Sequence, residues 1–441
     1  MYIARSAAVA AAVLTLAACG SQTMPSGAAF RTFSATGAGK ITHVIYIVQE
    51  NRSFDNLFQG YPGADTVSSG KDSSGQTLTL KPVSLAEQYE IDHSAQSMFA
   101  ACHGTGKLPG TKCRMDGFDE EAASGPPHPQ YVYVPHKESK PYFDMAHEWV
   151  LADRMFQSQL DESFVAHQYI IAAQAQSSVN LPGGQWGCSG LRYDTVSTIT
   201  KDRNPDGPAQ RPCFDYTTLG DELDAAKLTW RFYTSKFGSP SSDGGSYWSS
   251  YQAISHIYKH ADWANVITPQ KKFISDVAAG KLANFTWITP ECAFSDHVNC
   301  GGGYGPSWVS ALVNAVGKST FWDSTVIFVQ WDDWGGLYDH VPPPYLDADS
   351  AGFRVPLLVI SPYAKKDYVS HKQYETASVL RFAEDLYGLP QMTGADTRAL
   401  SPAADCLDFN QSPRAFVPIK APLGYEFFMH MKPDYRIPDE E

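Results

Sequence analysis

The sequence predicts an α/β fold with a doubly wound, mostly parallel central sheet that carries helices on both faces. Short apolar, strand-like runs alternate along the chain with longer runs of helical periodicity, which is the pattern of a parallel sheet built from strand–helix–strand units. Two of the strand-like runs end directly in polar residues, as expected where the ends of parallel strands form a site. The sequence contains no visible internal repeat.

In chain order, apolar and β-branched residues predict strands at 43–48, 229–233, 285–288, 325–330 and 355–360. Helical periodicity predicts helices at 269–279, 307–316 and 376–387. The stretches 68–135 and 181–212 are rich in Gly, Pro and Ser. We therefore expect these two stretches to be insertions that lie above the site.

The N-terminus has the shape of an export signal. Arg5 precedes an apolar stretch at 7–16, which is too short to span a bilayer, and Leu16-Ala17-Ala18-Cys19 follows. This ending resembles a bacterial lipobox, which implies cleavage before Cys19 and lipidation of its thiol. We expect a lipoprotein signal peptide at 1–18, a flexible tether at 19–40 and one domain at 41–441, held in the bacterial cell envelope and facing the periplasm or the cell surface. An ordinary secreted signal with a chance cysteine is the alternative.

Eight cysteines indicate an oxidising compartment. Once Cys19 is set aside, short spacings suggest three disulfides and leave Cys406 over: Cys102–Cys113, Cys188–Cys213 and Cys292–Cys300. Spacing alone does not fix the connectivity. A metal–thiolate cluster is the competing interpretation, although the sequence has no Cys-x-x-Cys pair.

The composition fits an exported globular enzyme. A chain of 441 residues with 43% hydrophobic and 18% charged residues can bury a large core without requiring two domains. The net charge of −13 argues against a nucleic-acid partner, because no basic stripe is available for a phosphate backbone. An anionic substrate would need local positive charge, which a metal ion can supply.

The two polar strand ends predict such a metal site. Glu50 and Asn51 follow the first strand, and Asp332 and Asp333 follow the strand at 325–330. Adjacent carboxylates in a dry site repel each other unless a cation lies between them. Oxygen ligands suit Mg²⁺, Ca²⁺ or Mn²⁺, while histidines elsewhere leave Zn or Fe open, so the number and identity of the divalent ions stay undetermined. The alternative is a helix cap at Glu50 and a solvated turn at Asp332.

Three long segments resemble the bacterial phosphoesterase family that contains phospholipases C and acid phosphatase A, within the alkaline-phosphatase-like superfamily. They are IVQENRSFDNLF, QWDDWGGLYDHVPPP and FRVPLLVISPYAKKDYVSHKQYETASVLRFAEDLYGLP, and the likeness runs from about Ile41 to Pro390. Three long motifs in order are far more specific than a single short pattern. The resemblance implies an alkaline-phosphatase-like fold and a phosphoesterase domain at 41–441.

The resemblance also implies that Ser163 is the nucleophile and a metal ligand, together with Glu50, Asn51, Asp332 and Asp333. From the residues alone, Ser163 opens a helix-like run, where a serine is commonly just an N-cap. The partial positive charge of the helix N-terminus would also favour an incoming phosphate. One departure matters. Relatives usually carry Ser/Thr-x-x-Asn before a basic residue, whereas this chain has Ala166 at the asparagine position, before His167. A phosphate hydrogen bond from that amide must be missing or supplied elsewhere.

Several histidines occupy motif positions, although most histidines in proteins are structural or on the surface. By similarity, His93 and His297 are the candidates for contact with the phosphate or the leaving group. His167, His340 and His371 are weaker candidates for phosphate binding or support. For His340 and His371, bracing of loops is the alternative.

We therefore expect metal-dependent hydrolysis of phosphate esters through a phosphoserine at Ser163. The Asp332-Asp333 pair and the Ser-Phe-x-x-His-Gln form of the nucleophile segment look nearer to acid phosphatase A, which favours phosphomonoesters. One alternative is a phospholipase C-type phosphodiesterase that acts on a phospholipid head group, with membrane contact through the lipid anchor only. Another is a Ser-His-Asp acyl hydrolase, for which the chain lacks Gly-x-Ser-x-Gly. The third is a non-catalytic surface lipoprotein.

Overall fold

A computed structural model describes residues 36–183, 186–236 and 248–436. The expected signal peptide at 1–18, Cys19 and the tether up to residue 35 lie outside the described residues. Of the tether, residues 36–40 are described, and the amides of Lys40 and Ile41 both donate to the carbonyl of Gly37 at 3.0 Å.

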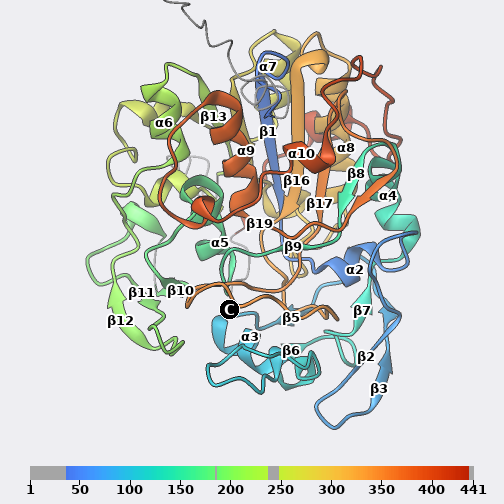
Figure 1. Cartoon of the computed structure of the whole chain (residues 1–441), viewed down its shortest axis with the longest axis vertical. Coiled ribbons are helices and arrows are strands. Elements are labelled where there is room, and N and C mark those ends of the chain that lie inside the picture. The colour runs from blue at the N-terminus through green and yellow to red at the C-terminus, as the bar shows by residue number, and fades with distance from the viewer. Residues whose placement is uncertain (1–35, 184–185, 237–247, 437–441) are drawn as a thin grey trace, which may run out of the picture.

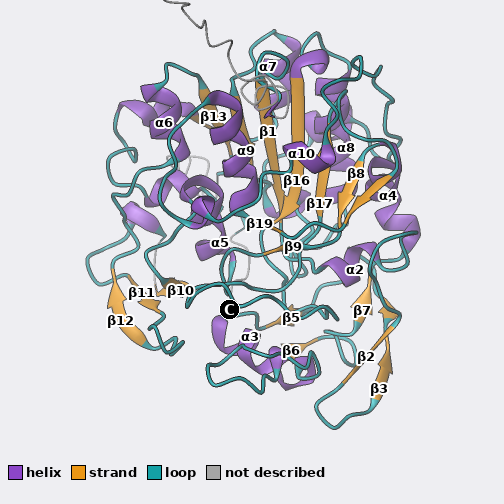
Figure 2. Ribbon diagram, in the orientation of Figure 1, coloured by secondary structure: helices purple, strands orange, loops and turns teal. Residues whose placement is uncertain are grey.

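An eight-stranded mixed sheet forms the centre of the protein (Figures 1 and 2). Its strands, in spatial order, are β14 (Val266–Ile267), β13 (Trp230–Tyr233), β15 (Phe285–Ile288), β1 (His43–Gln49), β16 (Thr325–Trp331), β17 (Leu357–Ile360), β8 (Val150–Ala152) and β18 (Tyr368–Ser370). Neighbouring strands are parallel except that β17 runs antiparallel to both β16 and β8. The predicted mostly parallel sheet is thus confirmed, with one reversed strand.

Side chains of β16 show that helices cover both faces of this sheet. The ring of Phe328 lies 5.0 Å from that of Phe382 in α9 (Ala377–Tyr387), and the ring of Trp331 lies 4.9 Å from that of Tyr142 in α4 (His136–Glu148). Side chains three positions apart in a strand point to opposite faces. Helices α4 and α9 therefore lie on opposite faces, as the doubly wound fold class requires.

The other helices join one of these two layers or lie in the connections. Helix α8 (Gly305–Gly317) contacts α4, α7 (Lys272–Ala278) and α11 (Tyr425–His430), whereas α5 (Ser163–Ala172) contacts α9 and α6 (Leu219–Ala225). The remaining helices are α2 (Phe54–Phe58), α3 (Ala95–Cys102) and α10 (Ala403–Cys406). The predicted helices at 269–279, 307–316 and 376–387 correspond to α7, α8 and α9.

The predicted insertions contain short strands outside the central sheet. The first holds β2 (Ser69–Lys71), β3 (Thr77–Thr79), β4 (Lys81–Pro82), β5 (Glu90–Ile91), β6 (Ala123–Ser124) and β7 (Val132–Tyr133), and it lies beyond the ends of β1 and β16 in the lower part of Figure 1. The second contains β10 (Ser178–Gly183), β11 (Thr195–Thr198) and β12 (Gly207–Gln210), which form a separate sheet. Strands β9 (Met155–Phe156) and β19 (Tyr374–Glu375) form a further, parallel pair outside the central sheet.

Three disulfides are present, in the pairing that the short spacings suggested: Cys102–Cys113, Cys188–Cys213 and Cys292–Cys300. Cys406 is buried and carries a free thiol. The first two bridges pin the two insertions, and the third closes the loop that carries His297. Within residues 36–183, 186–236 and 248–436, none of the helices combines the length and the apolar character needed to cross a bilayer.

Candidate active site

Two neighbouring parallel strands bring the predicted acidic pairs together. Residues of β1 and β16 are paired up to Gln49 with Trp331, so the next residues of both strands emerge at the same edge of the sheet. The amide of Asn51 donates to Asp332 Oδ1 at 3.0 Å, and both side chains are fully buried. The alternative of a solvated turn at Asp332 is therefore excluded by its burial.

The turn after β16 needs a glycine where it meets the turn after β1. Gly335 has φ +60°, and a Cβ placed on it would lie 2.7 Å from both Cβ and the carbonyl oxygen of Asn51. Asn51 itself adopts φ 56°, a conformation that asparagine tolerates better than most residues. The two turns are thus pressed against each other, which fixes the distance between the two polar pairs.

Helix α5 delivers Ser163 to this edge. Ser163 is the first residue of the helix, Glu162 holds the cap position, and the Ser163 side chain is fully buried. Its Oγ donates to Asp333 Oδ2 at 3.2 Å. Ser163 is therefore not the N-cap of this helix, so the alternative role that the sequence allowed is excluded. It is a buried hydroxyl directed at an aspartate.

One helical turn later, α5 delivers His167 to the same place. His167 Nε2 lies 3.3 Å from Glu50 Oε1 and 3.6 Å from Asp332 Oδ2, with all three side chains buried. The donor atoms of Glu50, His167 and Asp332 lie within 4.8 Å of one another, so these groups could hold a metal ion. His167, expected from sequence to support phosphate, faces the predicted metal ligands.

The electrostatics of Asp332 reflect this contact. Burial raises the pKa of the Asp332 carboxyl, but the hydrogen bond and charge of His167, with hydrogen bonds from Glu50 and from the amide of Asn51, outweigh burial. The net pKa of Asp332 lies well below its usual value, so the carboxylate is ionised at any pH near neutrality. Asp332 is therefore an ionised carboxylate in a buried place, in contact with His167.

His93 lies on the other side of Asn51. Its Nδ1 is 2.9 Å from the carbonyl of Ile91, which accepts only if Nδ1 carries the proton. Its Nε2 then accepts from Asn51 Nδ2 at 2.9 Å and lies 3.8 Å from Asp333 Oδ2. Burial lowers the pKa of His93 below its ordinary value, so the ring is neutral near pH 7, with the Nε2 lone pair facing the site.

His297 sits on a segment that is anchored to the end of β1. The Gln49 side chain donates to the carbonyl of Phe294 at 3.2 Å and accepts from the amide of Asp296 at 3.0 Å. The His297 ring packs 5.9 Å from that of Trp248, and its Nδ1 accepts from the amide of Asn299 at 3.3 Å. Its expected role at the leaving group stays a prediction.

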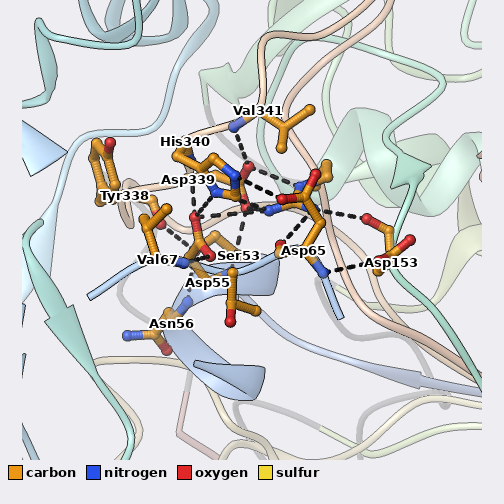
Figure 3. Close-up of polar contacts among 12 residues, drawn as sticks. Ser53, Asp55, Asn56, Asp65, Val67, Asp153, Tyr338, Asp339, His340 and Val341 are labelled. Carbon is orange, nitrogen blue, oxygen red and sulfur yellow. Dashed lines mark hydrogen bonds and ion pairs between the residues drawn. The ribbon is translucent and has the colours of Figure 1, made fainter. Parts of the chain in front are cut away.

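His340 and His371 belong to a separate charged cluster. His340 pairs with Asp55 and Asp65, at 2.6 and 3.1 Å, and His371 pairs with Asp153 at 2.8 Å. Figure 3 shows Asp55, Asp339 and His340 directed toward one another, with Asp65 and Asp153 beside them. These contacts correspond to the bracing alternative.

The second insertion packs against helix α5. The rings of Trp186 and Phe214 lie 4.9 and 6.2 Å from that of Phe164, the residue after Ser163. Trp186 and Phe214 each lie within two residues of a cysteine of the Cys188–Cys213 bridge. The bridge therefore fixes the insertion beside Ser163.

The chain matches the family model described as "Phosphoesterase family" over residues 41–390. It belongs to this family. It is thus a hydrolase of phosphoric ester bonds, and the buried serine beside clustered acids is the site at which that chemistry fits. The match covers both polar strand ends, helix α5 and the segment that carries His340 and His371.

Relatives of the phosphoesterase chain include several phospholipases C. It is 22% identical over 403 residues to phospholipase C A of Mycobacterium tuberculosis, covering 79% of this chain and 73% of the relative. It is 23% identical to non-specific phospholipase C1 of Arabidopsis thaliana, covering 80% and 68%, and 23% identical to hemolytic phospholipase C of Pseudomonas aeruginosa, covering 79% and 53%. Among solved structures, it is similar to a protein in the alkaline phosphatase superfamily from Vibrio parahaemolyticus, with 10% identity, 83% and 71% coverage and a TM-score of 0.37.

Proposed function

We propose that this phosphoesterase is a metal-dependent phosphodiesterase of the phospholipase C type, which cleaves its substrate through a phosphoserine at Ser163. The observation that carries the proposal is the contact of Ser163 Oγ with Asp333 Oδ2, beside the group of Glu50, His167 and Asp332. The names of the relatives favour a diester over the phosphomonoester that the sequence motifs suggested.

The residues present fit a divalent ion. Among the described residues, the buried atom Asn51 Oδ1 has no hydrogen-bond partner, and Asp332 Oδ2 has only a long contact with His167 Nε2 at 3.6 Å. Buried polar atoms rarely stay unsatisfied, so a ligand at this place would complete their bonding. The residues that would hold the ion are Glu50, Asn51, His167, Asp332 and Asp333. When bound, the ion would offset negative charge on the phosphoryl oxygens and favour the ionised form of the serine hydroxyl.

Ser163 supplies the nucleophile. Its Oγ forms a bond to phosphorus while the phosphorus–oxygen bond to the leaving alcohol breaks, and that alcohol departs with a proton. The intermediate is a phosphodiester that joins Ser163 Oγ to the head group. Water then attacks the same phosphorus, the bond to Ser163 Oγ breaks, and the phosphorylated head group is released. Asp333 holds Oγ in place by the hydrogen bond at 3.2 Å.

His93 is the residue that we propose moves the proton. Its Nδ1 proton is held by the carbonyl of Ile91, so Nε2 is the nitrogen that can exchange a proton with the site once it gives up the hydrogen bond that it accepts from Asn51 Nδ2. The ring is neutral near pH 7, which allows it to accept the serine proton and return it to the leaving oxygen. His297 stays the alternative acid.

The substrate class can be tested by steady-state kinetics. We expect kcat/KM for p-nitrophenylphosphorylcholine, a soluble diester, to exceed that for p-nitrophenyl phosphate by at least about tenfold. Chelator should abolish both activities, and p-nitrophenyl butyrate should not be hydrolysed. Preference for the monoester would overturn the diester assignment and would favour an acid phosphatase. Hydrolysis of the carboxylic ester that survives chelation would instead favour an acyl hydrolase.

For location, we propose a lipoprotein of the bacterial cell envelope, with its phosphoesterase domain at 41–441. Support comes from the lipobox-like sequence before Cys19 and from three disulfides, which form in oxidising compartments. We expect Cys19→Ser to convert an anchored protein into one that is soluble or retains its signal peptide. Mass spectrometry of the wild-type N-terminus checks this, and an unlipidated, wholly soluble wild type would contradict it.

A further inference from the structure

A second buried cluster of charge lies beside the candidate site, and Arg354 is at its centre. Arg354 is fully buried, and its guanidinium grips Asp339 through Nε to Oδ1 at 2.8 Å and Nη2 to Oδ2 at 3.1 Å. Nη2 also lies 3.6 Å from Asp55 Oδ2. The guanidinium stacks over the ring of Phe54 at 4.8 Å. One guanidinium thus compensates two buried carboxylates.

His340 provides the second positive charge of the cluster. Its Nδ1 lies 2.6 Å from Asp55 Oδ2 and its Nε2 lies 3.1 Å from Asp65 Oδ1. An ionised carboxylate can accept hydrogen bonds but cannot donate them. Both ring nitrogens of His340 must therefore carry protons, and the ring is an imidazolium. Burial lowers the pKa of His340, and the charge of Arg354 lowers it as well. The hydrogen bond and charge of Asp55, together with the charge of Asp339, outweigh both effects, so the pKa of His340 is raised above its ordinary value.

The cluster joins the two segments that carry the predicted metal ligands. Asp55 follows Asn51 along the chain, and Asp339 and His340 follow Asp333. The amide of His340 donates to Asp55 Oδ2 at 2.8 Å, and the amide of Asp55 donates to Asp339 Oδ2 at 3.2 Å. Nearby, Ser53 Oγ donates to the carbonyl of Tyr338 at 2.7 Å. Figure 3 shows these side chains converging from the two segments.

The cluster could be mistaken for a second metal site, because donor atoms of Asp55, Asp339 and His340 lie within 4.8 Å of one another. The ligand atoms of Asp339 and His340 already have partners within the protein. Both Asp339 oxygens bind Arg354, and both His340 nitrogens bind carboxylates. Positive side chains stand where an ion would otherwise compensate the acids.

We propose that Arg354 and His340 are positioning residues, which clamp the turn after β1 to the turn after β16 and so set the geometry in which Glu50, Asn51, Asp332 and Asp333 bind their metal ion. The clamp rests on the proposed metal site but not on the identity of the substrate. Loss of the clamp leaves every ligand present and weakens metal binding, because a displaced ligand must be reordered when the ion binds.

The sign of the pH dependence follows from His340. Its pKa is raised in the folded protein, so the stabilising ion pairs are fully present below its ordinary pKa of about 6.5 and are lost as pH rises through the higher, folded value. The charged groups that face His340 are Asp55, Asp65, Asp339 and Arg354. The clamp is therefore strongest at mildly acidic pH.

The test is calorimetric titration of the metal-free protein with Mn²⁺ alone, at about pH 6 and about pH 9, on either side of the histidine titration. We expect His340→Gln to raise the dissociation constant for Mn²⁺ by about tenfold or more at the lower pH. At the higher pH the difference from wild type should shrink, since wild-type His340 has then lost its charge. Arg354→Lys keeps the charge but loses the bidentate hydrogen bonding to Asp339, so it should weaken Mn²⁺ binding at both pH values.

His256→Gln is the matched control. Like His340, His256 bridges two aspartates, with Nδ1 2.7 Å from Asp215 Oδ1 and Nε2 3.0 Å from Asp221 Oδ1, and its pKa is likewise raised, but it lies on neither metal-binding segment. We expect this variant to bind Mn²⁺ as wild type does. Equal binding by wild type and by folded His340→Gln at both pH values would overturn the clamp, as would equal weakening by His256→Gln. If wild type binds no metal ion, the proposed function itself fails, and this outcome is distinct from the other two.

Discussion

Ser163→Ala is expected to fold and to lose catalysis by about 10³-fold or more, because it removes the hydroxyl that we propose attacks phosphorus. The substitution removes one buried hydrogen bond, so the free energy of unfolding should fall by only about 1 kcal/mol. The measurements are kcat on the soluble diester and thermal unfolding. Wild-type protein quenched during turnover of p-nitrophenylphosphorylcholine should carry phosphorylcholine on Ser163 in its peptide mass spectrum.

Ser178→Ala is the control for Ser163→Ala. Ser178 is also buried, and its Oγ donates to the carbonyl of Ala175 at 2.6 Å. It follows the C-terminal end of α5, whereas Ser163 is the first residue of that helix. It should lose similar stability and keep its turnover. Retention of more than about a tenth of wild-type kcat by Ser163→Ala would remove Ser163 from the nucleophile role.

Asp332→Asn is expected to lose metal affinity by at least about 100-fold, because a direct ligand should matter no less than the outer residues that orient it. His167→Ala should show the same direction if the imidazole binds the ion. Metal content of the purified proteins is measured by mass spectrometry. Thermal unfolding provides a second readout, since an ion that binds only the folded state stabilises wild type and should not stabilise the variant.

Asp396→Asn separates loss of a ligand from loss of a buried carboxylate. Asp396 is as buried as Asp332 and accepts from the amide of Gly394 at 2.7 Å, but it lies after α9 and away from both polar strand ends. Its metal content should match that of wild type. If Asp332→Asn also retains a full complement of metal, Asp332 is not a ligand.

The central strands could be predicted because they are long, apolar runs that are buried on both faces. The strands at 43–48 and 325–330 correspond to β1 and β16 almost residue for residue. The direction of β17 could not be predicted, since periodicity carries no information on strand orientation. Strands β8, β14 and β18 were missed because segments of two or three residues leave no pattern to detect.

At the site, the sequence located Ser163 and both acidic pairs but undervalued His167. The signal was present: residues four apart on a helix share a face, so His167 had to follow Ser163 toward the same edge. Arg354 was missed for a different reason. A single arginine before an apolar strand has no distinctive spacing, and its two carboxylate partners come from distant parts of the chain.

Helix α5 is buried along its whole length and carries both Ser163 and His167. The Ser163 hydroxyl and the His167 imidazole are therefore carried by one rigid helix, and a shift of that helix moves both. Selection for a new substrate cannot change the position of Ser163 without changing that of His167. Laboratory evolution of this enzyme should instead accumulate its changes in the segments around the helix, and changes inside the helix should be tolerated only when they preserve its register.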